Sequence, residues 1–333
     1  MRSTVLAFLV CCGMSASVAG PMRGVSVKGD EAYPIWRAAA ARSLAARGDA
    51  ESLATAAALT FAGSPSRSKA DAAKAATAAL DFASKSSELA PSNAAISWLR
   101  LQLCANALGC DIRDAATTMR WVDADNGAAW LPLLAIAQKD KDATEVDRIL
   151  TDMAEGGRFD LYSNRATVLM FDALKKVRAS LPTGYARSDV GRLAEAAGLT
   201  SAAFIPPFSP LINACREAIA ERRETCLSLA KTMQHADTIL AQLVGFAIER
   251  RLTAADAREV HALADRRHLL EWRVGSANQE DAAAPPWRAN ARARARVASM
   301  RKHAREEDAD IALLRARKLP IDPQPSNAVD VRR

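Results

Sequence analysis

Apolar side chains recur along this chain at the spacing of an α-helix. The first such segment covers residues 32–47, with apolar positions at Tyr33, Trp36, Ala40 and Leu44. Similar segments follow, separated by the Gly, Pro, Ser and Asn residues that are typical of turns and helix caps. Valine and isoleucine nowhere alternate with polar residues at a period of two. The pattern predicts an all-α protein.

One pattern occurs twice in residues 89–157. Asn93 and Asn126 lie 33 residues apart, and Trp98 and Trp130 lie 32 residues apart. Helix-turn-helix repeats have a period of about 34 residues and stack on one another as a solenoid. The spacing therefore predicts two consecutive helical hairpins, with the two tryptophans at equivalent positions.

The residues of these two units resemble the tetratricopeptide family. Trp98 and Trp130 match the opening Trp of the family motif, and each is followed three residues later by leucine, at Leu101 and Leu133. The units depart from the motif at Gln102, Leu134, Asn126 and Arg158. The resemblance implies helical hairpin repeats stacked as an α-solenoid that binds peptides, with no enzyme chemistry and no cofactor attached.

Turn signals and shifts in composition divide the chain into five predicted parts. They are a signal peptide at 1–19, a leader at 20–31, a helical repeat region at 32–204, a second helical subregion at 205–275, and a basic, flexible, largely disordered tail at 276–333. The boundary at 205 rests on the stiff connector Ile205-Pro-Pro-Phe208.

The amino terminus has the three parts of a secretory signal. Arg2 is the positive residue, Val5 to Met14 form a short apolar run, and Ser17-Val-Ala19 is a small-residue cleavage site. We therefore expect export to the periplasm or beyond. The alternatives are an uncleaved anchor, for which the run is shorter than the roughly 20 residues of a spanning helix, and a lipoprotein. A lipoprotein would use Cys11 or Cys12, where the sequence matches the lipoprotein box poorly.

Four cysteines remain after the signal: Cys104, Cys110, Cys215 and Cys226. In an exported chain an even number of cysteines is read first as disulfides. Four cysteines allow three connectivities, and proximity in sequence favours Cys104–Cys110 and Cys215–Cys226. An unbroken helix would hold the second pair about 16 Å apart, so we expect a helix to end between them and Thr225 to cap the next. The alternative is four buried thiols.

Net charge is concentrated at the carboxyl end of the chain. The formal net charge is +7, and residues 287–333 hold 12 Lys or Arg against six Asp or Glu. The body is electrically balanced, which gives no sign of a specific nucleic-acid groove. The basic tail is expected either to touch anionic lipid or another polyanion, or to extend into solvent without a partner.

One helical face carries possible metal ligands. His261, Asp265, His268 and Glu271 share a face at a spacing that could coordinate a metal. The alternative, which we favour, is a solvated polar face, because no second ligand-bearing helix is evident.

Four tryptophans are expected to be core anchors because each lies on the apolar side of its predicted helix: Trp36, Trp98, Trp130 and Trp272.

We expect an exported, non-catalytic helical-repeat scaffold that binds envelope proteins or peptides. The sequence has no nucleophile elbow, phosphate-binding loop or His-Glu-x-x-His motif. The alternative is an exported enzyme of unknown reaction, possibly metal-dependent through the His261 face.

The mature chain should begin at Gly20, because the charged, apolar and small-residue regions all lie before it. Amino-terminal sequencing of the protein from its native compartment tests this. Recovery of Met1 would contradict the prediction.

Overall fold

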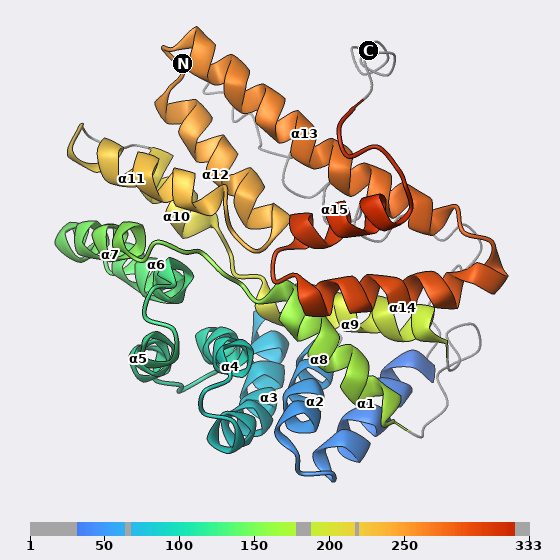
Figure 1. Cartoon of the computed structure of the whole chain (residues 1–333). Coiled ribbons are helices and arrows are strands. Elements are labelled where there is room, and N and C mark those ends of the chain that lie inside the picture. The colour runs from blue at the N-terminus through green and yellow to red at the C-terminus, as the bar shows by residue number, and fades with distance from the viewer. Residues whose placement is uncertain (1–31, 64–67, 178–187, 217–219, 324–333) are drawn as a thin grey trace, which may run out of the picture.

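The computed structural model describes residues 32–63, 68–177, 188–216 and 220–323. Within these ranges the chain is all-α, as predicted, and its helices pack mainly against their neighbours in sequence (Figure 1). The helices are α1 Ala32–Ala45, α2 Ala50–Gly63, α3 Lys69–Leu89, α4 Ala94–Asn106, α5 Ile112–Val122, the 3₁₀ helix η1 Gly127–Trp130, α6 Leu131–Lys139, α7 Ala143–Glu155, α8 Ser163–Lys175, α9 Asp189–Phe204, α10 Ser209–Arg216, α11 Ala220–Met233, α12 Ile239–Leu252, α13 Ala257–Ala282, α14 Pro286–Lys302 and α15 Glu306–Ala316.

Side-chain caps and glycines set the ends of the hairpin helices. Asn93 caps α4 by accepting the amide of Ile96, and Asp142 caps α7 by accepting the amide of Glu145. Gly109 has a φ of +72°, a left-handed conformation that costs glycine little, and it lies in the turn between α4 and α5. The hairpins α4–α5 and α6–α7 thus have the boundaries that the repeated pattern predicts.

The two repeat tryptophans lie in the first half of consecutive hairpins but differ in burial. Trp98 is fully buried in α4, as predicted for a core anchor. Trp130 ends η1 and is half-buried, with the guanidinium of Arg120 4.0 Å and that of Arg148 5.2 Å from its ring centroid. Trp98 is five residues past its capping asparagine, and in the second unit Leu131 takes that buried place. The prediction that Trp130 is a core anchor is therefore wrong, because the buried position of the second unit is one residue later, at Leu131. Of the other expected anchors, Trp36 is buried and Trp272 is half-buried.

A buried asparagine joins the second repeat to the segment that follows it. Asn126 donates its amide to the Asp160 carbonyl and to the Tyr162 hydroxyl, each at 2.9 Å. Its side-chain oxygen accepts from the backbone amides of Ala128 and Asp160. An isolated parallel bridge between Asn126 and Arg158 lies beside these bonds. The chain after Gly157 is thereby held in an extended path.

This extended path interrupts the order of the array. The α8–α9 hairpin turns back and packs on α2 and α4, whereas α10 packs on α6 and α11 on α7 (Figure 1). Helices α12 and α13 then continue from α11. The α10–α11 hairpin therefore follows α6–α7 in space, and α8–α9 is inserted between them in sequence. The predicted boundary at Ile205 marks the end of this insertion, and residues on both sides of it share one core.

The described part of the predicted tail, residues 276–323, is folded, where a largely disordered tail was expected; residues 324–333 lie outside the described residues. Helix α14 packs on α8 and α9, and α15 packs on α13 and α14. The arginines of α14 that suggested a solvated arm are paired with carboxylates. Arg296 binds Asp281 at 2.6 Å and Asp310 at 2.9 Å, and Arg294 binds Asp189 at 2.8 Å. Asp281 and Asp310 lie 15 and 14 residues from Arg296, and Asp189 lies 105 residues from Arg294, so the composition of the arginine-rich stretch itself did not reveal these pairs.

Both disulfides form with the predicted pairing. The Cα atoms are 5.3 Å apart for Cys104 and Cys110, and 5.7 Å apart for Cys215 and Cys226. A helix does end between the second pair, since α10 ends at Arg216. However, α11 begins at Ala220, and so Thr225 lies inside a helix and the prediction that it is a cap is wrong.

Several acids are buried where the α14–α15 turn meets the body. The Asp237 carboxylate accepts the amide of Leu161 at 2.7 Å, and the Glu306 carboxylate accepts the amide of Ile239 and the hydroxyl of Ser163. Burial raises the pKa of Asp237 and of Glu306. Burial also raises the pKa of Asp310 to about 6, although Arg296 opposes the shift.

We expect Cys215→Ala to lower the free energy of unfolding by about 2 to 3 kcal/mol, because the bridge closes a short loop in the unfolded chain. The double variant with Cys226→Ala should lose a comparable amount, since either change removes the same bond. Denaturant unfolding and thiol titration of the unfolded, unreduced protein provide the measurement. Four free thiols in the wild type would contradict the prediction.

The free energy of unfolding should rise as the pH falls from 7 to 5. An acid whose pKa is raised in the folded state binds its proton more tightly there than in the unfolded chain. Its contribution to the free energy of unfolding is therefore complete below its ordinary pKa and is lost as the pH rises through its folded-state pKa. Asp310 alone should contribute about 1 kcal/mol over this range. Urea unfolding of Asp310→Asn should show a smaller pH dependence. Asp308→Asn, whose side chain is 43% exposed on the same helix, should keep the wild-type dependence.

Candidate functional site

The possible metal ligands do not form a site. His261 and Asp265 approach at 3.7 Å, but their side chains are 81% and 71% exposed on α13. Glu271 is bound by Arg267 of the same helix at 2.8 Å. Nowhere in the described ranges do three His, Cys, Asp or Glu side chains gather as a metal site would require. The structure therefore places these four residues on a solvated face.

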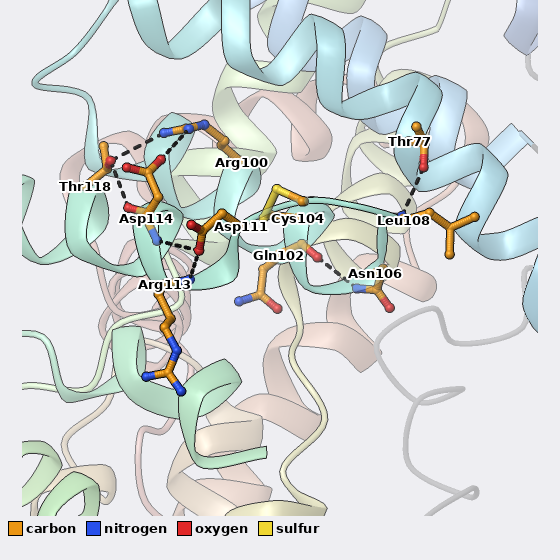
Figure 2. The surroundings of a disulfide bond; sticks show 11 residues. Thr77, Arg100, Gln102, Cys104, Asn106, Leu108, Asp111, Arg113, Asp114 and Thr118 are labelled. Atoms are coloured by element: carbon orange, nitrogen blue, oxygen red, sulfur yellow. Dashed lines mark hydrogen bonds and ion pairs between the residues drawn. A yellow bond between two sulfur atoms is a disulfide. The ribbon is translucent and has the colours of Figure 1, made fainter. Parts of the chain in front are cut away.

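The cysteines are structural. Figure 2 shows Cys104 near the end of α4, beside the cap of α5, where Asp111 accepts the amides of Arg113 and Asp114. The loop closed by Cys104 and Cys110 is tied to α3, because the amide of Leu108 donates to the Thr77 hydroxyl at 3.1 Å. With their sulfurs in disulfides, these side chains are not nucleophiles.

The first helices of the hairpins are covered by the protein's own chain. In a helical-repeat array these helices line the concave face on which partners bind. Here α2 is covered by α8 and α9, α4 by the same two helices, and α6 by α10. The indole nitrogen of Trp98 donates to the carbonyl of Phe204 at 2.9 Å, and Gln138 donates to the carbonyl of Pro210 at 2.7 Å. This inner face is therefore closed to a partner in the structure described.

An open groove lies at the amino-terminal end of the array. It has a volume of about 740 Å³, with α2 as its floor and α1 and α3 as its walls. Leu59 and Thr60 belong to the floor, and Ala38 and Phe82 belong to the two walls. The groove forms because α1 and α3 both pack on α2 and leave the space between them open. Its apolar interior suits side chains of a peptide more than a small polar substrate.

The edge of this groove carries charge. Arg42 stands on α1, and Asp71 and Lys74 stand on α3. Asp71 accepts the hydroxyl of Ser68 at 2.8 Å in the cap of α3. Among the described residues neither Arg42 nor Lys74 forms an ion pair. The edge therefore presents two cations that form no ion pair among the described residues, together with one carboxylate, beside an apolar floor.

An ion pair between a half-buried arginine and a buried glutamate fixes the α1 wall. Arg37 binds the Glu195 carboxylate of α9 at 2.8 Å and donates to the Ala62 carbonyl at the end of α2 at 3.0 Å. The Tyr33 hydroxyl donates to the same carboxylate. Burial raises the pKa of Tyr33, and the negative charge of Glu195 raises it further. These contacts hold α1 against both α2 and α9 and so set the width of the groove.

Sequence reasoning did not find this groove. Its residues come from three helices, and no motif marks them. The alanines of α3 were the available signal, since small side chains such as Ala75 leave room beside a helix. However, no pattern of residue spacing predicts that α1 and α3 pack on α2 with a gap between them.

No protein-family model matches this chain, and searches of curated proteins and of solved structures found no match. Within the described ranges, no helix combines the length and apolar character needed to cross a bilayer. The case for a function consequently rests on the geometry of the chain itself.

Proposed function

We propose that this protein is an exported, non-catalytic helical-repeat scaffold that binds a peptide segment of an envelope protein in the groove formed by α1, α2 and α3. The observation that carries the proposal is the groove itself, an open, largely apolar concavity of about 740 Å³. Tetratricopeptide-like stacking of its hairpins belongs to the same proposal.

The chemistry of the groove defines the partner. An apolar side chain of the peptide would rest over Leu59 between the walls, where it loses contact with water. A carboxylate flanking that side chain would approach Arg42 and Lys74, which form no ion pair among the described residues. We therefore propose a peptide with an apolar anchor and an acidic neighbour. Exposed charge pairs favour encounter and specificity more than affinity.

Two features support export. They are the signal-like residues 1–19 and the two disulfides, which persist in oxidising compartments.

Selection of a phage-displayed random peptide library on the mature protein tests the binding site. Selected peptides should carry an apolar residue next to an acidic one. Ala38→Trp places a large ring in the groove and should weaken their binding at least ten-fold by isothermal titration. Ala78→Trp, at an exposed position of α3 that does not line the groove, is the control and should bind as the wild type does.

An absence of selected peptides would contradict the proposal. Equal loss of binding in the two variants would contradict the assignment of the groove. Circular dichroism of each variant shows whether the helices remain formed.

A further inference from the structure

The groove between α1 and α3 offers few partners to a peptide backbone. Its interior is lined mainly by apolar side chains, those of Pro34, Ala38, Ala41, Leu59, Ala75 and Phe82. The hydroxyl of Thr60 on the floor already donates to the Ala56 carbonyl at 2.8 Å. The walls are helices, whose backbone groups bond within the helix. Helices α8 and α9, which cover the inner face of α2, contribute no residue to this groove.

This lining favours a partner that satisfies its own backbone. An extended peptide in the groove would leave amide and carbonyl groups away from water without hydrogen-bond partners, which is unfavourable. An α-helix bonds these groups internally and presents side chains to its surroundings. A helix can therefore enter this apolar groove at a lower cost than an extended segment.

The walls have the length and the small side chains that a bound helix requires. The lining residues run from Pro34 to Arg42 on α1 and from Asp71 to Phe82 on α3. At about 1.5 Å per residue, these stretches are about 12 Å and about 16 Å long, or about two to three helical turns. Alanines on both walls let another helix approach closely, and packed helices have axes about 8–10 Å apart.

Cations stand on both walls of the groove. Arg42 on α1 and Lys74 on α3 are exposed, and neither forms an ion pair among the described residues. A helix lying between the walls turns one flank to each of them. Residues adjacent in sequence project about 100° apart around a helix, so an acidic residue next to an apolar anchor lies on a flank. Charge complementarity therefore selects acidic residues on both flanks of the apolar stripe.

An exposed isoleucine lies beside the α1 wall. Ile35 is 68% exposed. It precedes Arg42 by seven residues, so the two side chains share a face of α1. A helix lying along the groove would cover Ile35 and remove apolar surface from water, whereas a single side chain inserted over Leu59 would leave it exposed.

We infer that the groove binds its partner as an amphipathic α-helix of about three turns, with an apolar stripe that is flanked by acidic residues on both sides. This inference rests on the proposed function, because it names the conformation and charge of the partner of the same groove.

Two phage libraries of equal amino-acid composition distinguish a helical partner from an extended one. The first places apolar residues at i, i+3, i+4 and i+7, and the second alternates apolar and polar residues. Selection on the full mature protein should enrich peptides from the first library, with acidic residues on both flanks of the stripe. Ala38→Trp, which fills the groove, should fail to retain them.

The most enriched peptide then reports its own bound conformation. A lactam bridge between polar residues four positions apart preorganises the helix and should tighten binding about three-fold or more. A central proline on the polar side should weaken binding at least about ten-fold, because it breaks the helix without removing an anchor. Isothermal titration measures both effects, and the NMR chemical shifts of the ¹³C-labelled peptide should be helical in the complex.

Charge reversal on each wall tests the two flanks. Arg42→Glu and Lys74→Glu should each weaken binding of this peptide about five-fold. Replacing the facing acidic residue of the peptide with lysine should restore binding to the matching variant, which a misfolded variant would not permit. Lys231→Glu makes the same charge change at an exposed position of α11 outside the groove and should bind as the wild type does.

The exposed isoleucine provides a further test. Ile35→Ala should weaken binding of the helical peptide about three-fold, because less apolar surface is buried in the complex. Leu240→Ala, which shortens a 40% exposed side chain on α12, is the control and should leave binding unchanged.

Each other occupant of the groove has its own outcome. Enrichment of the alternating library, or tolerance of the central proline, would overturn the helical partner and leave the proposed peptide groove in place. A dimer that Ala38→Trp dissociates in sedimentation would make a second copy of this chain the occupant and would also overturn the inference. Enrichment from neither library would overturn the proposed function and this inference together.

Discussion

The path of the chain depends on one buried amide. Asn126 has two N–H donors and an oxygen that accepts two hydrogen bonds, and all four capacities are satisfied. A buried amide that loses its partners costs about 1–3 kcal/mol for each unsatisfied group, which makes this geometry specific. The bonds fix residues 158–162, and Tyr162 enters α8 with a φ of +60°, a left-handed conformation that a tyrosine rarely adopts. From there the chain turns back across the array, covers its inner face and leaves the α1–α3 groove open.

Helix capping and residue spacing were sufficient to predict the hairpins and the disulfides, which depend on residues close together in sequence. Capping by Asn93 and Asp142, the repeat spacing and the proximity of the cysteines predicted the hairpins and both disulfides. The errors arose from a one-residue difference in spacing and from contacts with residues outside the local stretch. Trp98 lies five residues after Asn93 but Trp130 lies four after Asn126, which places Trp130 outside the core. Asp281 and Asp310 pair with Arg296 and hold the arginine-rich α14 in place. The groove also depends on such a contact, because its α1 wall is held by Arg37 through Glu195, 158 residues away.

Apolar packing dominates the contacts in the first part of the protein, whereas ion pairs are more prominent among α13, α14 and α15. The core around Trp98 is formed by large apolar side chains that are fully buried. A second, smaller apolar cluster lies between α12 and α13 and consists of Phe246, Leu263 and Leu270. In the α13–α15 region ion pairs are prominent. Arg296, held between two carboxylates, and the buried acids at the α14–α15 turn supply much of its specificity. Buried charge of this kind stabilises little in net terms, but a buried pair that loses one partner is strongly destabilising.

The inserted α8–α9 hairpin has a consequence for how the molecule acquires its structure. A simple solenoid can form hairpin by hairpin, because each unit contacts its neighbours alone. Here Arg37 must find Glu195, 158 residues further along the chain, and α14 must cover α8 and α9. Closure of such long loops slows folding. The amino-terminal helices can form their final contacts only after the residues of α8, α9 and α14 have been synthesised. The inserted hairpin therefore connects helices from the two ends of the described chain, because α8 and α9 contact both α2 and α14.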